Sequence, residues 1–163
     1  MRTILPLVAA LSAILTSGCI SAKQQVRYPD QTRSIEDPSK GRIYLVRPAA
    51  GGKGEIKISV ADVKTGRRYM AIGDVDSGGL RGQHLCWETA PGKIRIIADT
   101  IRGGVVKNGC STDLTVQAGM TYYVVQGMSL GGKYPMPTLE QVSEEKGRKE
   151  VGGTGQPKVS QGR

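Results

Sequence analysis

Apolar residues at every second position are the feature of this chain that most restricts its fold. Ile56, Ile58 and Val60 are separated by single polar or small residues, and the same spacing recurs at Ile94 and Ile96. A period of two places the apolar side chains on one face of a strand, so each run predicts a β-strand with one buried face. The chain also has 23 Gly and no Phe, and short apolar runs between Gly-rich turns favour strands over helices.

The spacing of these runs predicts the fold class. Strands are expected at residues 41–47, 56–61, 67–75, 80–88, 94–98, 105–106, 114–116 and 120–128, while residues 138–142 fit either a last strand or a short helix. About seven to eight short strands, with turns roughly every 8 to 12 residues, are typical of a sandwich or barrel. We therefore expect an all-β fold, namely a small antiparallel β-sandwich.

The N-terminus has the pattern of an export signal. Arg2 supplies a positive charge, residues 4–15 form an apolar run too short to span a bilayer, and small residues precede Cys19. This arrangement resembles the signal of bacterial lipoproteins, in which the Cys thiol accepts a lipid. We expect cleavage after Gly18, lipidation of Cys19 and a location in the bacterial cell envelope.

Two details bear on that interpretation. The lipoprotein pattern usually has Leu three positions before the Cys, whereas this chain has Thr16 there and Leu15 one step earlier. An ordinary signal peptide followed by a chance Cys is the alternative. Ile20 follows the Cys, and the absence of Asp at that position favours the outer membrane over the inner membrane.

The cysteine count suggests a disulfide. The chain has three Cys, so lipidation of Cys19 leaves the pair Cys86 and Cys110. Because the periplasm and cell surface are oxidising, this pair predicts a disulfide, and two buried free thiols are the alternative. The separation of 24 residues excludes a CxxC redox or zinc-ribbon motif.

Four segments are expected along the 163 residues. Residues 1–18 form the signal peptide, and residues 19–40 form the lipidated Cys with a flexible polar tether. Residues 41–143 form the β-sandwich, and residues 144–163 form a disordered tail rich in Gly, Lys and Gln. One domain of this size leaves no room for a multidomain enzyme.

Four short segments, in order, resemble a family of bacterial lipoprotein domains of unknown function. They are GRIYLVRP at residues 41–48, Pro91-Gly92, AGMTYY at residues 118–123, and LEQV at residues 139–142 followed by Glu144, Glu145 and Gly147. The resemblance covers residues 41–151. It implies a small β-sandwich and membrane anchoring, and it transfers no catalytic residue.

The net charge of +9, or +8 without Arg2, favours anionic partners such as lipopolysaccharide, peptidoglycan acids or phospholipid headgroups. It does not by itself indicate nucleic acid, and we expect none. Lys and Arg are scattered along the chain, so an evenly basic, solvated surface is the alternative. The expected partners are the membrane, through the lipid on Cys19, and an anionic envelope polymer or envelope protein.

Two Gly-rich turns have weak signals of binding sites. Residues 51–54 resemble a phosphate loop, but no Ser or Thr follows the Lys and a strand follows the turn, so a hairpin is expected. Residues 74–78 have DxDxG spacing but lack the later acidic ligand of a calcium loop, so a polar turn is expected. We predict no metal site and no cofactor.

Candidate catalytic residues are few. His84 is the only His, which excludes a site with two His ligands, and the GxSxG nucleophile motif is absent. Glu88 and Asp99 could pair across strands as glycosidase carboxylates do, although nothing in the sequence brings them together. We expect no enzymatic activity. The alternative is an envelope-anchored hydrolase or small-ligand binder that uses residues 84–88.

The aromatic residues have two interpretations. They either line a ligand groove or supply the aromatic core, and the absence of Phe favours the core; they are Tyr44, Tyr69, Trp87, Tyr122 and Tyr123. The leading interpretation of the whole chain is a lipid-anchored envelope lipoprotein whose non-enzymatic β-sandwich acts by binding or by structural support.

We predict that Cys19 is the acylated first residue of the mature protein. Mass spectrometry of the N-terminal peptide should detect the lipid-modified Cys, and the Cys19→Ala variant should leave the membrane fraction, because stable anchoring depends on the acyl chains. An unmodified mature chain that starts at another residue, or a Cys19→Ala protein that still partitions with membranes, would contradict this assignment.

Overall fold

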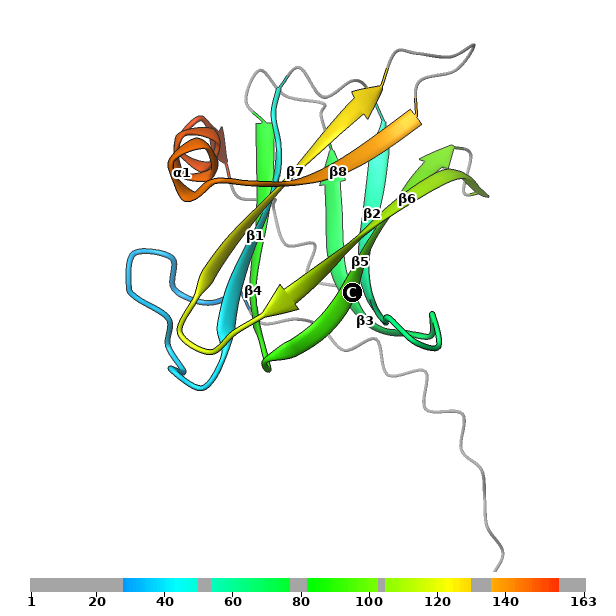
Figure 1. The fold of residues 1–163 in the computed structure, drawn as a ribbon. Helices are drawn as coiled ribbons and strands as arrows, with labels where there is room; N and C mark the ends of the chain where they lie inside the picture. The colour runs from blue at the N-terminus through cyan, green and yellow to red at the C-terminus, as the bar shows by residue number, and fades with distance from the viewer. Residues whose placement is uncertain (1–27, 50–53, 77–81, 103–104, 130–135, 156–163) are drawn as a thin grey trace, which may run out of the picture.

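The computed structural model describes residues 28–49, 54–76, 82–102, 105–129 and 136–155. Within them, two β-sheets pack face to face and one helix lies on the outer face of one sheet (Figure 1). The predicted all-β sandwich is therefore confirmed. These residues contain nine strands, more than expected, because the short strand β9 forms where no strand was predicted.

The five-stranded sheet has the order β8-β7-β1-β4-β9. Its strands are β1 (Gly41–Arg47), β4 (Gly82–Thr89), β7 (Thr121–Ser129), β8 (Met136–Val142) and β9 (Thr154–Gly155). β1 lies at the centre, antiparallel to β4 and parallel to β7, and β9 is parallel to β4. The sheet is thus mixed rather than antiparallel, because β7 follows two excursions of the chain into the other sheet and arrives beside β1 in the same direction.

The four-stranded sheet has the order β3-β2-β5-β6 and is antiparallel throughout. Its strands are β2 (Glu55–Asp62), β3 (Arg68–Asp76), β5 (Gly92–Arg102) and β6 (Val105–Val116). The sequence predicted two short strands within residues 105–116, but β6 is continuous. β6 pairs with β5 along the whole of both strands. The register shifts once, between Thr100 and Ile101, as it does at a β-bulge.

The main core lies between the sheets and follows the predicted alternation. In β2, Ile56, Ile58 and Val60 are buried, whereas Glu55 and Lys57 are exposed. Trp87 of β4 is fully buried in the same core, as the absence of Phe suggested. Each fully buried apolar side chain of this kind contributes about 1.5–3 kcal/mol, so this layer supplies most of the driving force for folding.

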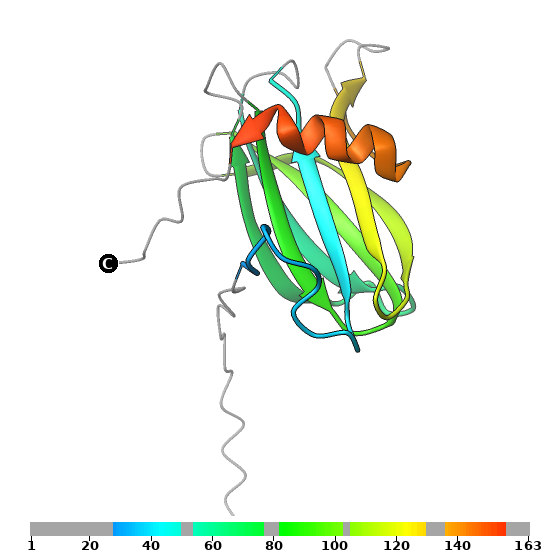
Figure 2. The ribbon, with the colours of Figure 1, turned by 90° about the vertical axis from the view of Figure 1, so that its left-hand side faces the viewer.

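A second apolar cluster lies on the outer face of the five-stranded sheet. It contains Tyr44, Val46, Cys86 and Tyr123, with Val151 packed against them. Helix α1 (Glu144–Gly152) lies across β4, β1 and β7 on this face, and the segment before β1 covers another part of it (Figure 2). β1 is therefore buried along its whole length on both faces.

The structure corrects both ends of the predicted domain. The expected disordered tail at residues 144–163 contains α1 and β9, and the expected tether at residues 19–40 is folded from Tyr28 onward. The Ser143 side chain caps α1 by accepting a hydrogen bond from the Lys146 amide at 3.4 Å. Residues 28–40 are held by hydrogen bonds to Arg42, Glu88 and His84, and α1 packs on the outer cluster through Val151, so the domain exceeds the expected 41–143.

Gly147 determines how closely α1 approaches the sheet. A Cβ atom at this position would lie 2.1 Å from Cγ of Tyr123. The helix backbone therefore rests directly on the Tyr123 ring, and a residue with a side chain at position 147 would push the helix outward.

We predict that Gly147→Ala lowers the free energy of unfolding by about 1–3 kcal/mol, the usual effect of overpacking a close contact. The control is Gly152→Ala in the same helix, where the added Cβ has no atom within 4 Å. Because Ala favours helix over Gly, the control should be neutral or slightly stabilising. Urea denaturation measures both values. Equal stability of the two variants would show that α1 does not press on Tyr123.

Candidate functional site

A groove of about 470 Å³ lies on the outer face of the five-stranded sheet, between the N-terminal segment and α1. We call it the tyrosine groove. Arg42, Tyr44 and Tyr123 of β1 and β7 form its floor. One wall is residues 31–35, and the other is formed by residues 148–152 of α1. The groove is thus built by segments from the two ends of the described chain.

Two stacked tyrosines form the centre of the floor. Tyr44 and Tyr123 are register partners in the parallel β1–β7 pair, so their side chains extend from the same face. Their ring centroids are 5.3 Å apart and the ring planes differ by 9°. Burial raises the pKa of Tyr44 to about 12 and also raises the pKa of Tyr123. Both phenols therefore stay protonated at neutral pH. The Tyr44 hydroxyl has side-chain hydrogen bonds with Arg42 and Cys86, and the Tyr123 hydroxyl has one with Arg148.

A buried ion pair holds the N-terminal wall in place. The Arg42 guanidinium donates to Glu88 Oε1 from Nε at 3.0 Å and from Nη2 at 2.8 Å, and the side chains are only 4% and 10% exposed. Arg42 also donates to the carbonyl oxygens of Arg33 at 2.7 Å and Ser34 at 3.1 Å. Glu88 Oε1 accepts from the Glu36 amide at 3.0 Å. Loss of one partner of such a buried pair costs about 3–5 kcal/mol.

His84 joins the same two segments at a second point. Its Nε2 lies 2.7 Å from Gln31 Oε1, and its Nδ1 lies 2.7 Å from Thr154 Oγ1. In the neutral ring protonated on Nε2, Nε2 donates to Gln31, and the single proton of the Thr154 hydroxyl goes either to His84 Nδ1 or to the Val151 carbonyl oxygen 2.9 Å away. Burial lowers the pKa of His84, which favours this neutral form. His84 therefore fastens β4 to the segments at both ends of the domain.

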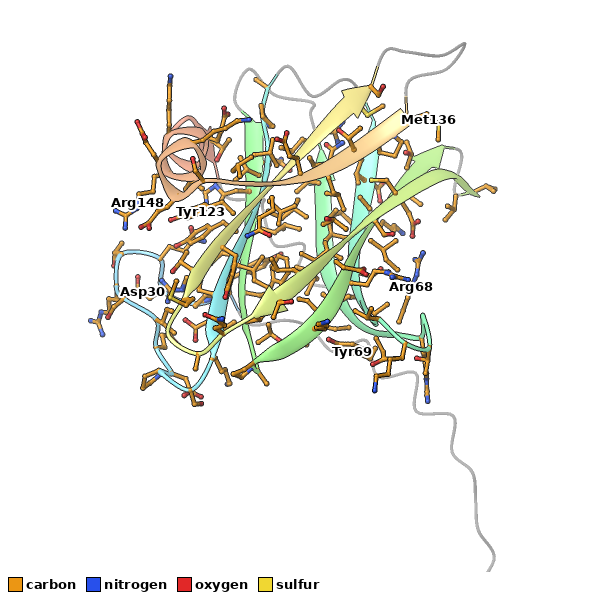
Figure 3. The ribbon with its side chains drawn as sticks, in the orientation of Figure 1. Asp30, Arg68, Tyr69, Tyr123, Met136 and Arg148 are labelled. Atoms are coloured by element: carbon orange, nitrogen blue, oxygen red, sulfur yellow. The ribbon has the colours of Figure 1, made fainter. Side chains whose placement is uncertain are left out.

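Two further guanidinium groups flank the tyrosine groove and are exposed. Arg33 pairs with Asp30 at 3.2 Å, with side chains 80% and 43% exposed. Arg148 pairs with Glu144 at 2.6 Å, with side chains 71% and 62% exposed. Figure 3 shows Arg148 and Tyr123 together beside α1, with Asp30 on the segment that faces them. Exposed pairs of this kind contribute about 0–1 kcal/mol, so both guanidiniums can turn to a ligand.

The residues predicted for catalysis are not brought together. His84 and Glu88 extend from the same face of β4, but the hydrogen-bond partners of His84 are Gln31 and Thr154, and Glu88 binds Arg42. Asp99 lies on the other sheet and pairs with Arg68. The Glu88–Asp99 carboxylate pair considered from the sequence is therefore absent, because the two strands carry these residues on the outer faces of different sheets.

The disulfide expected between Cys86 and Cys110 is not formed, and this prediction is wrong. Cys86 packs in the outer cluster beside Tyr44, whereas Cys110 packs against the core between the sheets. Both are free cysteines. Burial raises the pKa of Cys86 to about 12 and that of Cys110 to about 11, so both remain thiols at neutral pH. Side chains on different faces of two sheets cannot be bridged without refolding.

Several of the other residues singled out in the sequence lie only partly within the described residues. Asp74 is exposed at the end of β3, and residues 77–78 of the same turn lie outside the described residues, as do Cys19 and residues 51–53 of the Gly-rich turn. Within the described ranges, no group of three or more His, Cys, Asp or Glu could hold a metal ion. Tyr69 is 47% exposed, so this aromatic residue is not in the core.

The sequence analysis gave Tyr44 and Tyr123 a place in a ligand groove only as the alternative to the aromatic core, and it did not identify the other residues of the groove. One signal was present: in a strand at residues 41–47, Arg42 and Tyr44 must share a face. A second signal was Ser143 followed by Glu144 and Glu145, a typical helix start that predicts α1. The meeting of the two walls depends on tertiary contacts, above all those of Arg42 and Gly147, which no local pattern indicates.

We predict that His84 makes folding stability depend on pH in a specific window. Its folded pKa is lowered, so above about pH 6.5 the ring is neutral in both states and its contribution is complete. As the pH falls below about 6.5, the unfolded chain takes up the proton first, so the free energy of unfolding falls until the folded pKa is reached, by at most about 1.4 kcal/mol per pH unit.

Urea denaturation at a series of pH values between about 7.5 and 5 tests this sign, because free carboxylates titrate mostly below that window. The chain has one His, so the His84→Gln variant should lose the decline. The same decline in both proteins would assign it to other groups.

Comparison of the chain with protein families, curated proteins and solved structures gives no match. The resemblance to a lipoprotein domain family therefore stays a prediction. In the described ranges, no helix is both long enough and apolar enough to cross a bilayer. The geometry of the tyrosine groove is accordingly the basis for the functional argument.

Proposed function

We propose that the chain is a lipid-anchored lipoprotein of the bacterial cell envelope whose β-sandwich binds a ligand in the tyrosine groove without chemical turnover. The observation that carries this proposal is the groove itself. Its floor is held rigid by a buried ion pair and a tyrosine stack, and its rim has two exposed guanidinium groups. A preorganised floor with adaptable charged groups around it suits reversible binding.

The chemistry of the lining supports binding over catalysis. The described residues that line the groove include no His, Cys, Asp or Glu that could act as base or nucleophile. The alternative hydrolase would use residues 84–88, where His84 is 5% exposed and both ring nitrogens lie within hydrogen-bond distance of neutral side chains. A general base needs access to its substrate proton, so this arrangement gives the hydrolase less support.

The predicted anchor places the groove near the membrane. Eight residues separate Cys19 from Tyr28, the first described residue of the N-terminal segment. Fully extended, this connection spans about 30 Å. A lipid on Cys19 would therefore keep the Arg33 wall close to the bilayer surface, where even weak contacts gain from a high effective concentration.

The test is to fill the groove and measure retention on envelope material of a chain that starts at residue 20, which keeps the whole sandwich but has no acyl anchor. Gly152 lines the groove, and no atom lies within 4 Å of a Cβ placed there, so Gly152→Trp adds bulk without a backbone collision. The matched control is Thr115→Trp, an exposed neutral position on the four-stranded sheet.

We predict that Gly152→Trp weakens retention on purified envelope fractions about tenfold or more, whereas Thr115→Trp leaves it unchanged. Retention should also decline with added salt, because the Debye length falls from about 10 Å at 0.1 M to about 3 Å at 1 M. Equal retention of the two variants would show that the groove is not the binding surface. A hydrolytic activity lost in His84→Ala would instead support the enzyme.

A further inference from the structure

We propose that the tyrosine groove binds a phosphate group, and that its source is the headgroup of an anionic lipid in the membrane that anchors the chain. This inference rests on the proposed function and names the ligand class of the same site. The evidence is the placement of guanidinium groups around the groove, the protonation of its two phenols and the length of the tether.

The guanidinium groups reach the groove from three sides. Arg33 lies in the N-terminal wall, Arg148 lies in the helical wall, and Arg42 lies in the floor. No carboxylate is among the described lining residues, because the acidic partners of these arginines lie outside the lining. An anion in the groove therefore meets three guanidinium groups, and it must replace Asp30 at Arg33 and Glu144 at Arg148 to bind them.

The three guanidiniums have different roles. Arg42 is committed to Glu88 and to two backbone carbonyls, so it shapes the floor. Arg33 has an exposed ion pair with Asp30, and Arg148 has an exposed ion pair with Glu144 and a hydrogen bond with the Tyr123 hydroxyl. Exposed ion pairs contribute about 0–1 kcal/mol, so a ligand can replace these carboxylates. A charge-assisted bond from guanidinium to phosphate is stronger than a neutral hydrogen bond and can be bidentate.

The arrangement fits phosphate better than carboxylate. A carboxylate has two oxygens in one plane and is satisfied by a single guanidinium fork. A phosphomonoester has three acceptor oxygens in a tetrahedral arrangement, so it can accept from two opposed guanidiniums and a phenol together. Tyr123 lies between the two walls in the floor and remains a protonated donor.

The tether indicates the source of the phosphate. About 30 Å of extended chain between Cys19 and Tyr28 limits the distance between the groove and the bilayer. Headgroup phosphates are present at that surface, and those that are monoesters, as in phosphatidic acid, have the three free oxygens that the groove suits, so the anchor raises their effective concentration at the groove.

The first experiment titrates the full-length chain, in nonionic detergent, with glycerol 1-phosphate and separately with acetate. We expect glycerol 1-phosphate to bind at least about tenfold more tightly than acetate. Arg33→Gln and Arg148→Gln should each weaken phosphate binding about tenfold. Lys149→Gln, which removes one exposed charge from the same helix outside the lining, should change the affinity less than about twofold.

Three results would overturn the phosphate assignment. They are no binding of glycerol 1-phosphate, equal affinity for acetate, and an equal loss of affinity in Lys149→Gln, which would indicate general attraction to a basic surface. Circular dichroism of each variant confirms the fold. Arg33→Lys, which keeps the charge but removes the fork, should bind with intermediate affinity.

The second experiment identifies the source by placing the full-length chain in phosphatidylcholine vesicles that contain either phosphatidic acid or oleate at matched surface charge. If headgroups occupy the groove, phosphatidic acid should raise the apparent Kd for free glycerol 1-phosphate about tenfold above the value in oleate vesicles. Equal Kd values would assign the site to soluble phosphate and overturn the lipid source.

These results separate the ligand class from the proposed function. If Gly152→Trp abolishes retention on envelope fractions while glycerol 1-phosphate fails to bind, the groove binds another ligand and only the phosphate assignment is wrong. If phosphate binds as expected but Gly152→Trp leaves retention unchanged, the groove is a phosphate site and the proposed envelope function is wrong.

Discussion

The outer layer of this sandwich depends on the buried ion pair between Arg42 and Glu88. Two charges that are 4% and 10% exposed are stable there only because the surrounding hydrogen bonds satisfy them. Those bonds come from the backbone of the N-terminal segment, through the Arg33 and Ser34 carbonyls and the Glu36 amide. Removing either charge would therefore leave the other unpaired and release one wall of the tyrosine groove.

The helix is fastened by a different kind of contact, which lacks charge and depends on close approach. Gly147 brings the α1 backbone onto the Tyr123 ring, and that ring stacks on Tyr44 of β1. His84 then joins the two systems, since its ring binds Gln31 on one side and Thr154 on the other. Three independent contacts thus hold segments from both ends of the described chain on one sheet face, which explains why that face is covered and the groove is shaped.

Sequence periodicity predicted the sandwich because its inner faces follow a simple rule, in which Ile56, Ile58 and Val60 alternate with polar positions. The rule failed where a strand is buried on both faces. β1 is buried at every position, so its sequence does not alternate between apolar and polar residues. The sequence of β1 therefore does not indicate that a helix covers its outer face. The disulfide prediction failed for a related reason, since counting cysteines ignores that Cys86 and Cys110 face different layers.

The position of the site follows from this topology. A groove between two terminal segments cannot exist before both segments have docked on the sheet. Its geometry therefore depends on the complete fold and not on any single strand. One of its walls continues directly into the segment that leads to Cys19, and that wall carries Arg33. Arg42 donates to two backbone carbonyl oxygens of this wall, so the wall is fixed directly to the groove floor. The sandwich supports the β1 and β7 floor of the groove, and the contacts of Arg42 and Gly147 hold the N-terminal wall and α1 on that floor.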